Sequence, residues 1–492
     1  MRSWSYRNSG CLGKILPSLC IVIILLAMAG TELTTNRAAI NQDMVLSPGT
    51  PQTGAFFDYV VLVIMENKPL CYIVGSIVIG CAASTVAPYE TKLAQNYTLA
   101  TNYTSVGHPS PPDYVALISG STFNMSSQCF PIQPCGSDHL CCPINAPNIV
   151  DRFDQAGLTW KAYAEDYTSG CRPLGQPLPF NYFQDIYNNS TRCKNLVGVG
   201  WPLNSTGDPE IFLHDLNSTK SASNFMWFSP SPCDQWHHLC TGYGATNQGD
   251  FYLSTVVPRI LDSTIFNTQR AALYIVYDEG YGKGSDTCPI GRGDCVYAVW
   301  AGPQVKRGYM CGESYSHYSF LATLEFNWGL QNLTSNDGSA RPMNELFKNG
   351  PPCELQSGFT YNPNKPQAGR TVDFSGLVTG GTQPYSYSWN FGDGDHGTGQ
   401  ATGHAYQKAG GYTTTVTVTD AAGQKITASR TLAIATGSAS PSGICFQCLL
   451  RNPIASLLLI GLPVGLTLAL VFVTFARRRS KRKRILRLAS SP

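Results

Sequence analysis

Charged residues are scarce in this chain of 492 residues: they make up 13% of it, whereas 43% of the residues are hydrophobic. Such a composition excludes an intrinsically disordered polymer, and the length allows two or three domains with a large core. Acidic residues are absent from the first 14 residues, which hold three basic side chains, and from Arg477–Arg487, which holds eight. The rest of the chain has 23 basic and 31 acidic residues, a net charge of −8, and therefore lacks the basic face that nucleic-acid binding requires.

Charge is also missing from the 24 residues Pro453–Ala476. At about 1.5 Å of rise per residue, a helix of this length crosses a hydrocarbon layer of about 30 Å. The basic run Arg477–Arg484 follows directly, and basic residues stay on the cytoplasmic side of a membrane. We therefore expect a linker at 436–452, a single transmembrane helix at 453–476 and a basic cytoplasmic tail at 477–492. Everything before the helix would lie outside the cell, on the cell membrane.

The N-terminal residues 1–29 have the order of a signal peptide. Three basic residues precede a short apolar run at Leu19–Ala29, and Ala27-Met28-Ala29 offers small residues for cleavage. An uncleaved N-terminal anchor is the alternative. Residues 30–54 are polar and rich in turn-forming residues, so we expect a linker there.

The cysteines agree with export, because 14 of the 18 lie between Cys71 and Cys353. An even number of cysteines in an extracellular protein indicates disulfide bonds. Close spacing suggests four pairs: Cys71/Cys81, Cys171/Cys193, Cys233/Cys240 and Cys288/Cys295. A zinc site is the alternative for the group Cys129, Cys135, Cys141 and Cys142. Sequons for N-glycosylation, which predict a glycoprotein, begin at Asn96, Asn102, Asn124, Asn188, Asn189, Asn204, Asn217 and Asn332.

Residues 55–350 alternate strand-like and helix-like segments. Continuous apolar runs at Tyr59–Met65, Phe225–Phe228 and Leu273–Tyr277 are typical of buried parallel strands. Between and after them, apolar residues recur with helical spacing, as in Ile149–Ala156 and Phe320–Trp328. The alternation predicts an α/β domain with helices on both faces of a sheet.

Residues 357–435 have a different pattern, with short alternating strands such as Tyr385–Trp389 and Tyr412–Thr419 and Gly/Asp turns between them. This is the pattern of a small β-sandwich. The region closely resembles a PKD domain in the motifs Trp389–Gly394, His404–Tyr406 and Gly411–Asp420. The resemblance implies an Ig-like sandwich that acts as a spacer or binds a partner at the cell surface, and not catalysis.

Four residues of this sandwich could suggest a metal site: Asp393, Asp395, His396 and His404. We interpret them instead as turn and core residues, because turns between the strands of such a sandwich are rich in Asp and Gly.

Polar residues follow two of the predicted strands in the α/β region. Glu66 and Asn67 come directly after Tyr59–Met65, and Asp278 and Glu279 come directly after Leu273–Tyr277. Ligands bind at the carboxyl ends of strands in open α/β sheets. Carboxylate and amide oxygens suit a divalent cation, so the two pairs predict a metal site if they converge. For each pair alone, the start of an ordinary loop is the alternative.

Prolines surround a serine in the segment His108-Pro109-Ser110-Pro111-Pro112, which precedes a helix-like stretch at Val115–Ile118. A hydroxyl at Ser110 would lie near a helix N-terminus, where N–H groups favour an anion. That is a suitable place for a nucleophile that attacks phosphorus. A helix-capping role for Ser110 is the alternative.

Five short motifs in the same order resemble the phosphoesterase family of bacterial acid phosphatases and phosphatidylcholine-type phospholipases C, a branch of the alkaline phosphatase superfamily. They cover about residues 56–335 and read Val63–Asn67, His108–Pro112, Ser119–Thr122, Tyr277–Gly280 and His317–Ser319. The resemblance implies an alkaline-phosphatase-like fold. It also implies a divalent metal ion bound by Glu66, Asn67, Asp278 and Glu279, with Ser110 as nucleophile.

The resemblance also implies roles for three histidines. His237 matches the active-site histidine of the family, and His108 and His317 fall at positions near the phosphate, where a histidine could protonate a leaving alkoxide.

The sequence departs from the family pattern at three positions. Lys68 stands where the family usually has His, and Ser316 stands where it frequently has Asp. Asp113 occupies a substrate-binding position where Asn is frequent, and a carboxylate there would repel phosphate unless it is protonated or faces the metal.

The sequence therefore predicts a cell-surface, metal-dependent hydrolase of phosphate esters that forms a phosphoryl-serine intermediate. A phospholipase C-type phosphodiesterase is the alternative within the same fold. A non-catalytic surface or adhesion protein on an inactive phosphoesterase fold is the rival from a different class.

Overall fold

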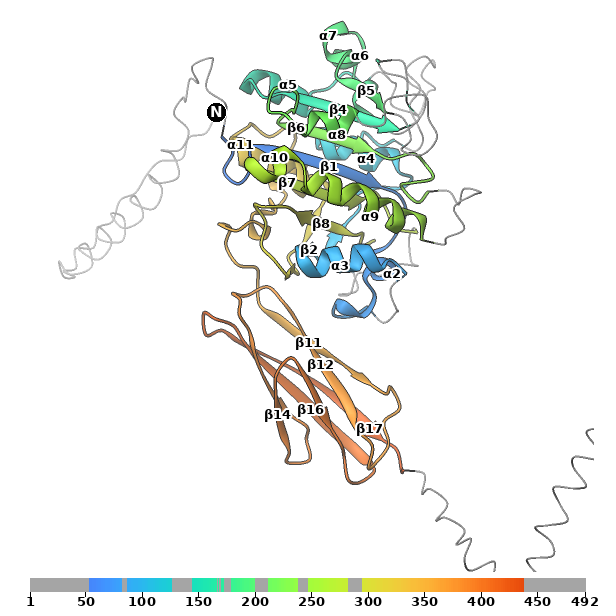
Figure 1. The fold of residues 1–492 in the computed structure, drawn as a ribbon, viewed down its shortest axis with the longest axis vertical. Coiled ribbons are helices and arrows are strands. Elements are labelled where there is room, and N and C mark those ends of the chain that lie inside the picture. Colours follow the sequence, from blue (N-terminus) through green and yellow to red (C-terminus); the bar gives the residue numbers. More distant parts are fainter. Residues whose placement is uncertain are drawn as a thin grey trace, which may run out of the picture.

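The computed structural model describes residues 53–437, apart from gaps at 82–85, 126–143, 166, 168–169, 172–177, 200–210, 238–246 and 282–293. These residues form an α/β domain followed by a β-sandwich (Figure 1). In the part of the chain that is described, no helix is long and apolar enough to span a membrane. The expected signal peptide, transmembrane helix and cytoplasmic tail lie outside the described residues.

A sheet of eight strands forms the centre of the α/β domain. Strands β5, β4, β6, β1 and β7 are parallel neighbours, β8 is antiparallel to both β7 and β2, and β9 is parallel to β2 at the edge. In their order across the sheet the strands are β5 (Leu196–Val199), β4 (Trp160–Glu165), β6 (Phe225–Ser229), β1 (Tyr59–Met65), β7 (Ala271–Tyr277), β8 (Ala298–Ala301), β2 (Thr98–Ala100) and β9 (Tyr309–Cys311). A separate parallel pair consists of β3 (Tyr103–Thr104) and β10 (Tyr315–Ser316).

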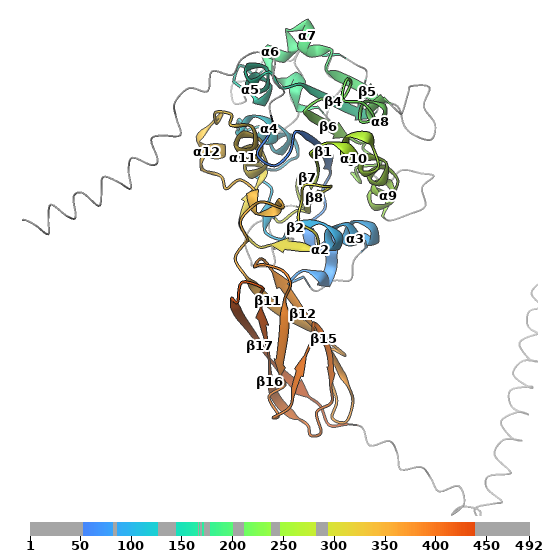
Figure 2. The same cartoon turned by 60° about the vertical axis from the view of Figure 1, so that its left-hand side comes forward.

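Helices cover both faces of this sheet, as Figure 2 shows with the sheet nearly edge-on. One face carries α3 (Pro88–Asn96), α9 (Gln248–Leu261) and α10 (Thr264–Thr268), and the opposite face carries α4 (Pro111–Ser119), α5 (Ile149–Ala156), α11 (His317–Trp328) and α12 (Ser335–Ser339). The shorter helices are α2 (Leu70–Val74), α6 (Gln184–Tyr187), α7 (Ser190–Cys193), α8 (Ile211–Asp215), η1 (Gly75–Ile77), η2 (Pro179–Tyr182) and η3 (Asn344–Leu346). The expected α/β domain with helices on both faces is thus confirmed.

The central strands are apolar because both of their faces are covered. Every residue of β7 is buried, and in β1 all residues after Tyr59 are buried. Parallel strands that helices cover on both faces consist of continuous apolar residues, without the alternation of apolar and polar residues seen in half-exposed strands. The continuous apolar runs are the pattern from which these strands were predicted. The predicted strand at Tyr59–Met65 and the predicted helix at Ile149–Ala156 coincide with β1 and α5.

The β-sandwich consists of two antiparallel sheets. One holds β11 (Gln356–Asn362), β12 (Val372–Thr379) and β15 (Ala401–His404), and the other holds β14 (His396–Thr398), β13 (Ser386–Asn390), β16 (Gly410–Thr419) and β17 (Lys425–Ile434). Its core is built on the fully buried Trp389 and includes Phe374, Phe391 and Val416. Inward and outward residues alternate along the strands, as the sequence pattern predicted.

The sandwich contacts the edge of the central sheet at β9. The Gly380 N–H donates to the carbonyl of Met310 at 2.6 Å, and the Tyr309 hydroxyl donates to the carbonyl of Gly381 at 3.2 Å. A disulfide joins Cys311 of β9 to Cys353, just before β11. These contacts fix the two domains against each other, and this disulfide was not among the pairs suggested by spacing.

Two of the disulfides suggested by spacing are present, Cys71–Cys81 and Cys171–Cys193. Cys233 and Cys295 are each disulfide-bonded. Their expected partners, Cys240 and Cys288, lie outside the described residues, as do the four cysteines for which zinc was the alternative.

Candidate active site

The ends of β1 and β7 bring the two predicted ligand pairs together. The strands are adjacent and parallel, and they pair Met65 with Tyr277, so Glu66 and Asp278 leave the sheet side by side. Asn67 has a positive φ of 55°, a left-handed conformation that asparagine tolerates. Its N–H and that of Glu279 donate to Oδ1 of Asp278 at 3.0 and 2.7 Å. Glu66, Asn67, Asp278 and Glu279 are called the ligand cluster below.

Each member of the ligand cluster has a buried oxygen that accepts no hydrogen bond from the described residues, except that the Glu279 oxygen contacts Nδ1 of His108. These atoms are Glu66 Oε2, Asn67 Oδ1, Asp278 Oδ2 and Glu279 Oε2. Buried polar atoms without hydrogen bonds are rare, because each costs about 1–3 kcal/mol of desolvation. Carboxylate and amide oxygens are the donors that hard divalent cations prefer. The donor set therefore fits a divalent cation.

The charges of the cluster point to the same conclusion. Burial is the largest cause that raises the pKa of Glu66 to about 7, and the nearby charge of Glu279 adds to it. Burial, followed by the charges of Glu66 and Glu279, raises the pKa of Asp278 well above its usual range. Three carboxyl groups in a dry site cannot all be ionised unless a cation balances them.

Ser110 lies beside this cluster, immediately before α4. Its hydroxyl Oγ is buried and donates a hydrogen bond to Oε1 of Glu279 at 3.2 Å. Although Ser110 occupies the N-cap position of α4, its side chain makes no capping hydrogen bond. The hydroxyl is thus directed at the carboxylates rather than at the helix, contrary to the capping alternative.

The predicted anion site at the start of α4 is not present in the form expected from the sequence. The first two residues of the helix are Pro111 and Pro112, which have no N–H to offer. The N–H groups of Asp113 and Tyr114 both donate to the carbonyl of Ser110. These two N–H groups and the two prolines therefore offer no free donor to a phosphate at the start of α4.

His108 lies at the rim of the site between two carboxylates. Its Nδ1 contacts Oε2 of Glu279, and its Nε2 lies 2.9 Å from Oδ2 of Asp294. The same Asp294 oxygen accepts from the N–H of Gly280 at 2.8 Å and from the hydroxyl of Ser105 at 3.1 Å. With 29% of its side chain exposed, His108 can still meet solvent or substrate.

His237 lies on the other side of the cluster, in the loop after β6. Its Nε2 is 3.5 Å from Oε2 of Glu66, and 34% of its side chain is exposed. The loop is fixed at its start, where the Ser231 N–H donates to Glu165 at 2.9 Å. It is fixed again just before His237, where the carbonyl of Gln235 accepts from the Glu66 N–H at 2.9 Å.

His317 is brought to the same region but is fully buried. Its Nε2 lies 2.6 Å from the carbonyl oxygen of Asp278 and 3.3 Å from Oδ1 of Asp113, while Nδ1 lies 3.0 Å from the Tyr103 hydroxyl. A carbonyl can only accept, so Nε2 carries the proton and donates it to this bond. His317 therefore holds the backbone of the ligand cluster, and both of its ring nitrogens are occupied by protein groups.

Asp113 is also fully buried, and it binds the backbone of the loop that precedes Ser110. Its Oδ1 accepts hydrogen bonds from the N–H groups of Val106 and Gly107 at 2.8 and 3.0 Å. This geometry positions the loop before the serine. Its other oxygen, Oδ2, is buried and has no hydrogen-bond partner among the described residues, so the substrate contact that the family position implies stays a prediction.

Three contributors to the site did not emerge from the sequence: Tyr114, Asp294 and the bonding role of Lys68. The Tyr114 hydroxyl donates to Oε1 of Glu66 at 2.7 Å. Its spacing of four residues from Ser110, which puts both on one helix face, was an available signal. Asp294 is distant in sequence from every motif and had none.

Lys68 connects the ligand cluster to the loop that carries His237. Its Nζ donates to the carbonyls of Asn67 at 3.1 Å and Trp236 at 3.0 Å, and it lies 5.3 Å from the ring centroid of Trp236. The departure from the family pattern at this position therefore has a structural function.

In the sandwich, Asp393, Asp395 and His404 place possible ligand atoms within 4.8 Å of one another. His404 Nε2 lies 2.7 Å from Oδ2 of Asp393, and its ring stacks on Phe391. His396 stands on the exposed β14 strand. A hydrogen bond between His404 and Asp393, packed on Phe391 of the sandwich core, accounts for these contacts.

Comparisons with known proteins agree with this geometry. A family model described as "Phosphoesterase family" matches residues 58–331, and a model described as "PKD domain" matches residues 360–435. The first match covers more than half of the chain, and it includes every residue of the ligand cluster as well as Ser110 and the three histidines.

Individual proteins are similar at low identity. A protein of Kluyveromyces lactis named "Probable acid phosphatase" is 24% identical over 305 residues, which cover 58% of this chain and 63% of that one. A Mycobacterium tuberculosis protein named "Phosphatidylinositol-3-phosphatase" is 24% identical over 301 residues, covering 59% of this chain and 83% of that one. A solved alkaline phosphatase superfamily protein from Vibrio parahaemolyticus aligns with 73% of this chain and 84% of its own, at 12% identity and a TM-score of 0.38. The chain thus spans slightly less than two thirds of the first of these relatives.

Proposed function

The chain belongs to the phosphoesterase family, and from this premise we propose that its α/β domain hydrolyses phosphate monoesters with Ser110 as the nucleophile. The observation that carries the proposal is the hydrogen bond from Ser110 Oγ to Oε1 of Glu279 at the edge of the ligand cluster. A serine hydroxyl is a weak nucleophile until a neighbouring group takes its proton. Relatives named as an acid phosphatase and a phosphatidylinositol-3-phosphatase support phosphate esters as the substrate class.

The reaction proceeds in two displacements. In the first, Oγ of Ser110 forms a bond to phosphorus, its proton passes to Oε1 of Glu279, and the bond from phosphorus to the ester oxygen breaks. The leaving alkoxide takes a proton from His237, which reaches solvent at the mouth of the site. In the second, His237 removes a proton from water, the resulting hydroxide attacks phosphorus, and the serine–phosphorus bond breaks. The proton on Glu279 returns to Oγ as phosphate leaves.

We further propose that the ligand cluster holds a divalent cation. Glu66 Oε2, Asn67 Oδ1 and Asp278 Oδ2 would bind it, because these buried oxygens have no hydrogen bonds among the described residues, and Glu279 Oε2 would join them beside its contact with His108. Such an ion supplies positive charge that lowers the pKa of a serine hydroxyl and balances the phosphoryl oxygens. His317 and Asp113 act as positioning residues, since one fixes the Asp278 carbonyl and the other fixes the loop before Ser110.

Replacement of Ser110 tests the proposal. Ser110→Ala should lower kcat on p-nitrophenyl phosphate by about 10³-fold or more, as removal of a nucleophile does. It should leave metal binding and the melting temperature close to those of the wild type. Ser119→Ala is the matched control, because that serine on the same helix donates to the Val115 carbonyl away from the ligand cluster. Retention of more than about a tenth of the wild-type rate, a loss of only ~1.4 kcal/mol, would exclude Ser110 as the nucleophile.

The same preparation separates the other two candidate functions. Faster hydrolysis of phosphatidylcholine or of bis(p-nitrophenyl) phosphate than of the monoester would favour a phospholipase C-type phosphodiesterase. If a folded, metal-loaded protein hydrolyses none of these esters, the non-catalytic surface protein is favoured instead.

We also propose that the protein is anchored in the cell membrane by residues 453–476, with both folded domains outside. Disulfides such as Cys71–Cys81 and Cys311–Cys353 support this location, because disulfides persist in oxidising compartments. Protease added to intact cells should degrade the region 55–435 and spare a tag placed at the C-terminus. Protection of the α/β domain would exclude this topology.

A further inference from the structure

A pocket of about 420 Å³ lies between the two domains, away from the ligand cluster. The α/β domain contributes α3, η1 and β9 to its wall, and the sandwich contributes β11, β12 and the start of β13. Its volume falls within the range of about 300–1,000 Å³ that small-molecule sites occupy, and domain interfaces are a frequent place for such sites. The residues that line it are Ser76, Ile77, Gln95, Gly308, Met310, Thr360, Ser375, Leu377, Val378, Gln383, Tyr385, Tyr387 and Gln400.

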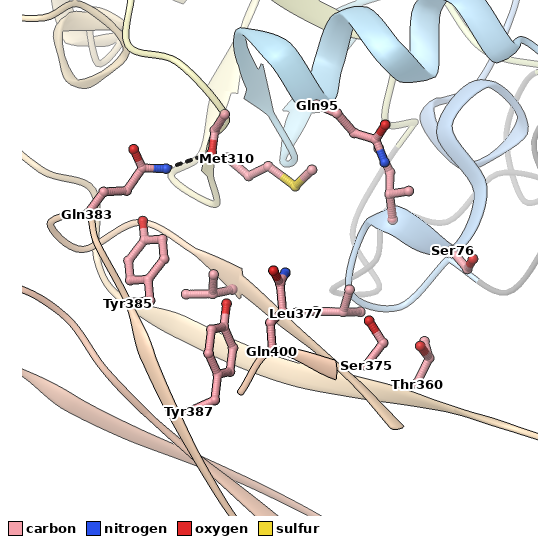
Figure 3. Close-up of a pocket in the computed structure, with 13 residues that line it drawn as sticks. Ser76, Gln95, Met310, Thr360, Ser375, Leu377, Gln383, Tyr385, Tyr387 and Gln400 are labelled. Atoms are coloured by element: carbon pink, nitrogen blue, oxygen red, sulfur yellow. Dashed lines mark hydrogen bonds between the residues drawn. The ribbon is translucent and has the colours of Figure 1, made fainter. Parts of the chain in front are cut away.

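The walls of this interdomain pocket are fixed to each other. The Gln383 amide Nε2 donates to the Gly308 carbonyl at 2.8 Å across the boundary, beside the backbone bond from Gly380 to Met310 (Figure 3). The Cys311–Cys353 disulfide joins β9 covalently to the residues just before β11. A ligand would therefore meet a preformed site and would not have to order two loosely tethered domains.

The polar groups of the pocket point into it from the sandwich side. Figure 3 shows the hydroxyls of Tyr385 and Tyr387 and the amide of Gln400 directed toward the α/β domain. The Tyr387 ring can lie across β12 only because residue 376 is glycine, since a Cβ there would be 2.8 Å from Cδ1 of the ring. Burial raises the pKa of Tyr387, so its hydroxyl stays protonated and available as a donor at neutral pH.

The lining contains no charged side chain. It offers three amides, three hydroxyls and two phenols, next to the apolar surface of Ile77, Met310, Leu377 and Val378. Two of the amides are held by the protein: Nε2 of Gln383 as described, and Nε2 of Gln400 by the Gly376 carbonyl at 3.3 Å. Each of these two amides is thereby fixed in orientation and keeps its oxygen as an acceptor.

These features select one class of ligand. A phosphate, carboxylate or metal ion would enter without any opposite charge to compensate its desolvation. The Tyr385 hydroxyl already donates to the Gly380 carbonyl at 2.6 Å, but a purely apolar ligand would cover the amide oxygens of Gln383 and Gln400 without giving them partners. A molecule with many neutral hydroxyl groups and an apolar ring face satisfies both sets of groups, since its hydroxyls both donate and accept and its C–H face packs on Tyr and Leu side chains.

We propose that the interdomain pocket binds a neutral saccharide. The site is separate from the ligand cluster, so it does not depend on the proposed phosphatase reaction. A protein with this site would dock on glycans through the boundary of its two domains while the catalytic cluster stays free for substrate.

The test uses the full-length protein in detergent, made without N-glycans so that its own sugars cannot occupy the pocket. It is titrated with neutral mono- to tetrasaccharides of glucose, galactose, mannose and N-acetylglucosamine, and with glucose 6-phosphate as a charged counterpart, by calorimetry and saturation-transfer NMR. We expect at least one neutral saccharide to bind and its 6-phosphorylated form to bind more weakly.

Two variants remove pocket groups from exposed positions, where the fold does not need them: Gln95→Ala on α3 and Ser375→Ala on β12. Each should weaken saccharide binding by about tenfold, the loss of one or two hydrogen bonds. Tyr387→Phe, which keeps the ring, should do the same. Gln407→Ala and Ser388→Ala are matched controls at exposed positions of the sandwich outside the pocket, and they should bind as the wild type does. Hydrolysis of p-nitrophenyl phosphate should be unchanged in all five.

Three results would overturn the proposal. The first is the absence of binding by any neutral saccharide of the panel at millimolar concentration. The second is tighter binding of the phosphorylated sugar than of its neutral form. The third is binding that the pocket variants and the control variants weaken equally, since it would place the saccharide elsewhere on the protein.

Discussion

The imidazole of His317 donates a hydrogen bond from Nε2 to the main-chain carbonyl of Asp278, at 2.6 Å. His317 thus positions Asp278, another residue of the family motifs. The side chain of Asp278 belongs to the ligand cluster, and His317 binds its main-chain carbonyl. His237, in contrast, contacts Glu66 from the exposed side of the site. The two histidines therefore differ in function although both stand in family motifs.

This difference predicts that the effect of replacing His237 depends on the leaving group, whereas the effect of replacing His317 does not. His237→Gln should lower kcat/KM, which reports only the first displacement, strongly for alkyl phosphates, whose alkoxides need a proton, and only weakly for p-nitrophenyl phosphate, whose phenolate does not. His317→Gln should lower kcat/KM for both substrates by the same factor, because His317 positions Asp278 and transfers no proton to the leaving group. Steady-state kinetics on the two substrates decides the matter, and equal behaviour of the two variants would contradict these roles.

Replacement of Asp278 should act through the metal. Asp278→Asn keeps an oxygen that can accept from the N–H groups of Asn67 and Glu279, so the turn should stay intact. It loses the charge that a divalent cation needs, and metal affinity should fall by about 10–100-fold or more. Excess metal should restore part of the activity, whereas Ser110→Ala should not respond to metal. Metal content by mass spectrometry is the direct readout, and Asp262→Asn, at an exposed position, is the control.

Lys68 should matter through the loop that carries His237. Lys68→Met keeps the apolar stem but removes the two hydrogen bonds to the Asn67 and Trp236 carbonyls. We expect kcat to fall by about tenfold, a loss of ~1.4 kcal/mol. Because the effect passes through His237, the double variant with His237→Gln should be little worse than His237→Gln alone. Additive losses in that double-mutant cycle would show that Lys68 acts independently.

The stability of the α/β domain should depend on pH through Glu325 of α11. This side chain is buried, and burial, followed by the charge of Asp337, raises its pKa to about 8. The folded state therefore holds a proton that the unfolded chain releases near its ordinary pKa of about 4.5. Stability should consequently fall as the pH rises from about 4.5 to about 8, and the full penalty should apply above that window.

Glu325→Gln removes this titration while its amide oxygen can still accept from Asn332, as Oε2 of Glu325 does at 2.6 Å. At pH 9 the variant should melt a few degrees above the wild type, and at pH 5 the two should be nearly equal. Melting curves between pH 5 and pH 9 measure this, with Glu354→Gln at an exposed position as the control. A constant difference between variant and wild type across the pH range would contradict the prediction.

The sequence by itself determined the elements whose signal is local. A continuous apolar run predicts a strand covered on both faces, which is why β1 and β7 could be read directly from the chain. Alternation predicts a strand with one wet face, as in β16 of the sandwich. The polar pairs at the strand ends, the serine among prolines and the family motifs likewise stand in short segments, so these candidate residues could be named from the sequence, whereas Tyr114 and Asp294 did not emerge from it.

Only the tertiary structure decided which of these residues meet and what each one does. The order of the sheet places β1 between β6 and β7, and this neighbourhood brings Glu66 to both Asp278 and His237. The apolar pattern of a strand does not specify the order of the strands in the sheet, because the residues of a strand are equally buried whichever strand lies beside it. The bond from His108 to Asp294, the disulfide from Cys311 to Cys353 and the pocket between the domains arise in the same way. They depend on contacts between segments that are far apart in the chain. These contacts stabilise the protein only after the sheet and the sandwich have assembled.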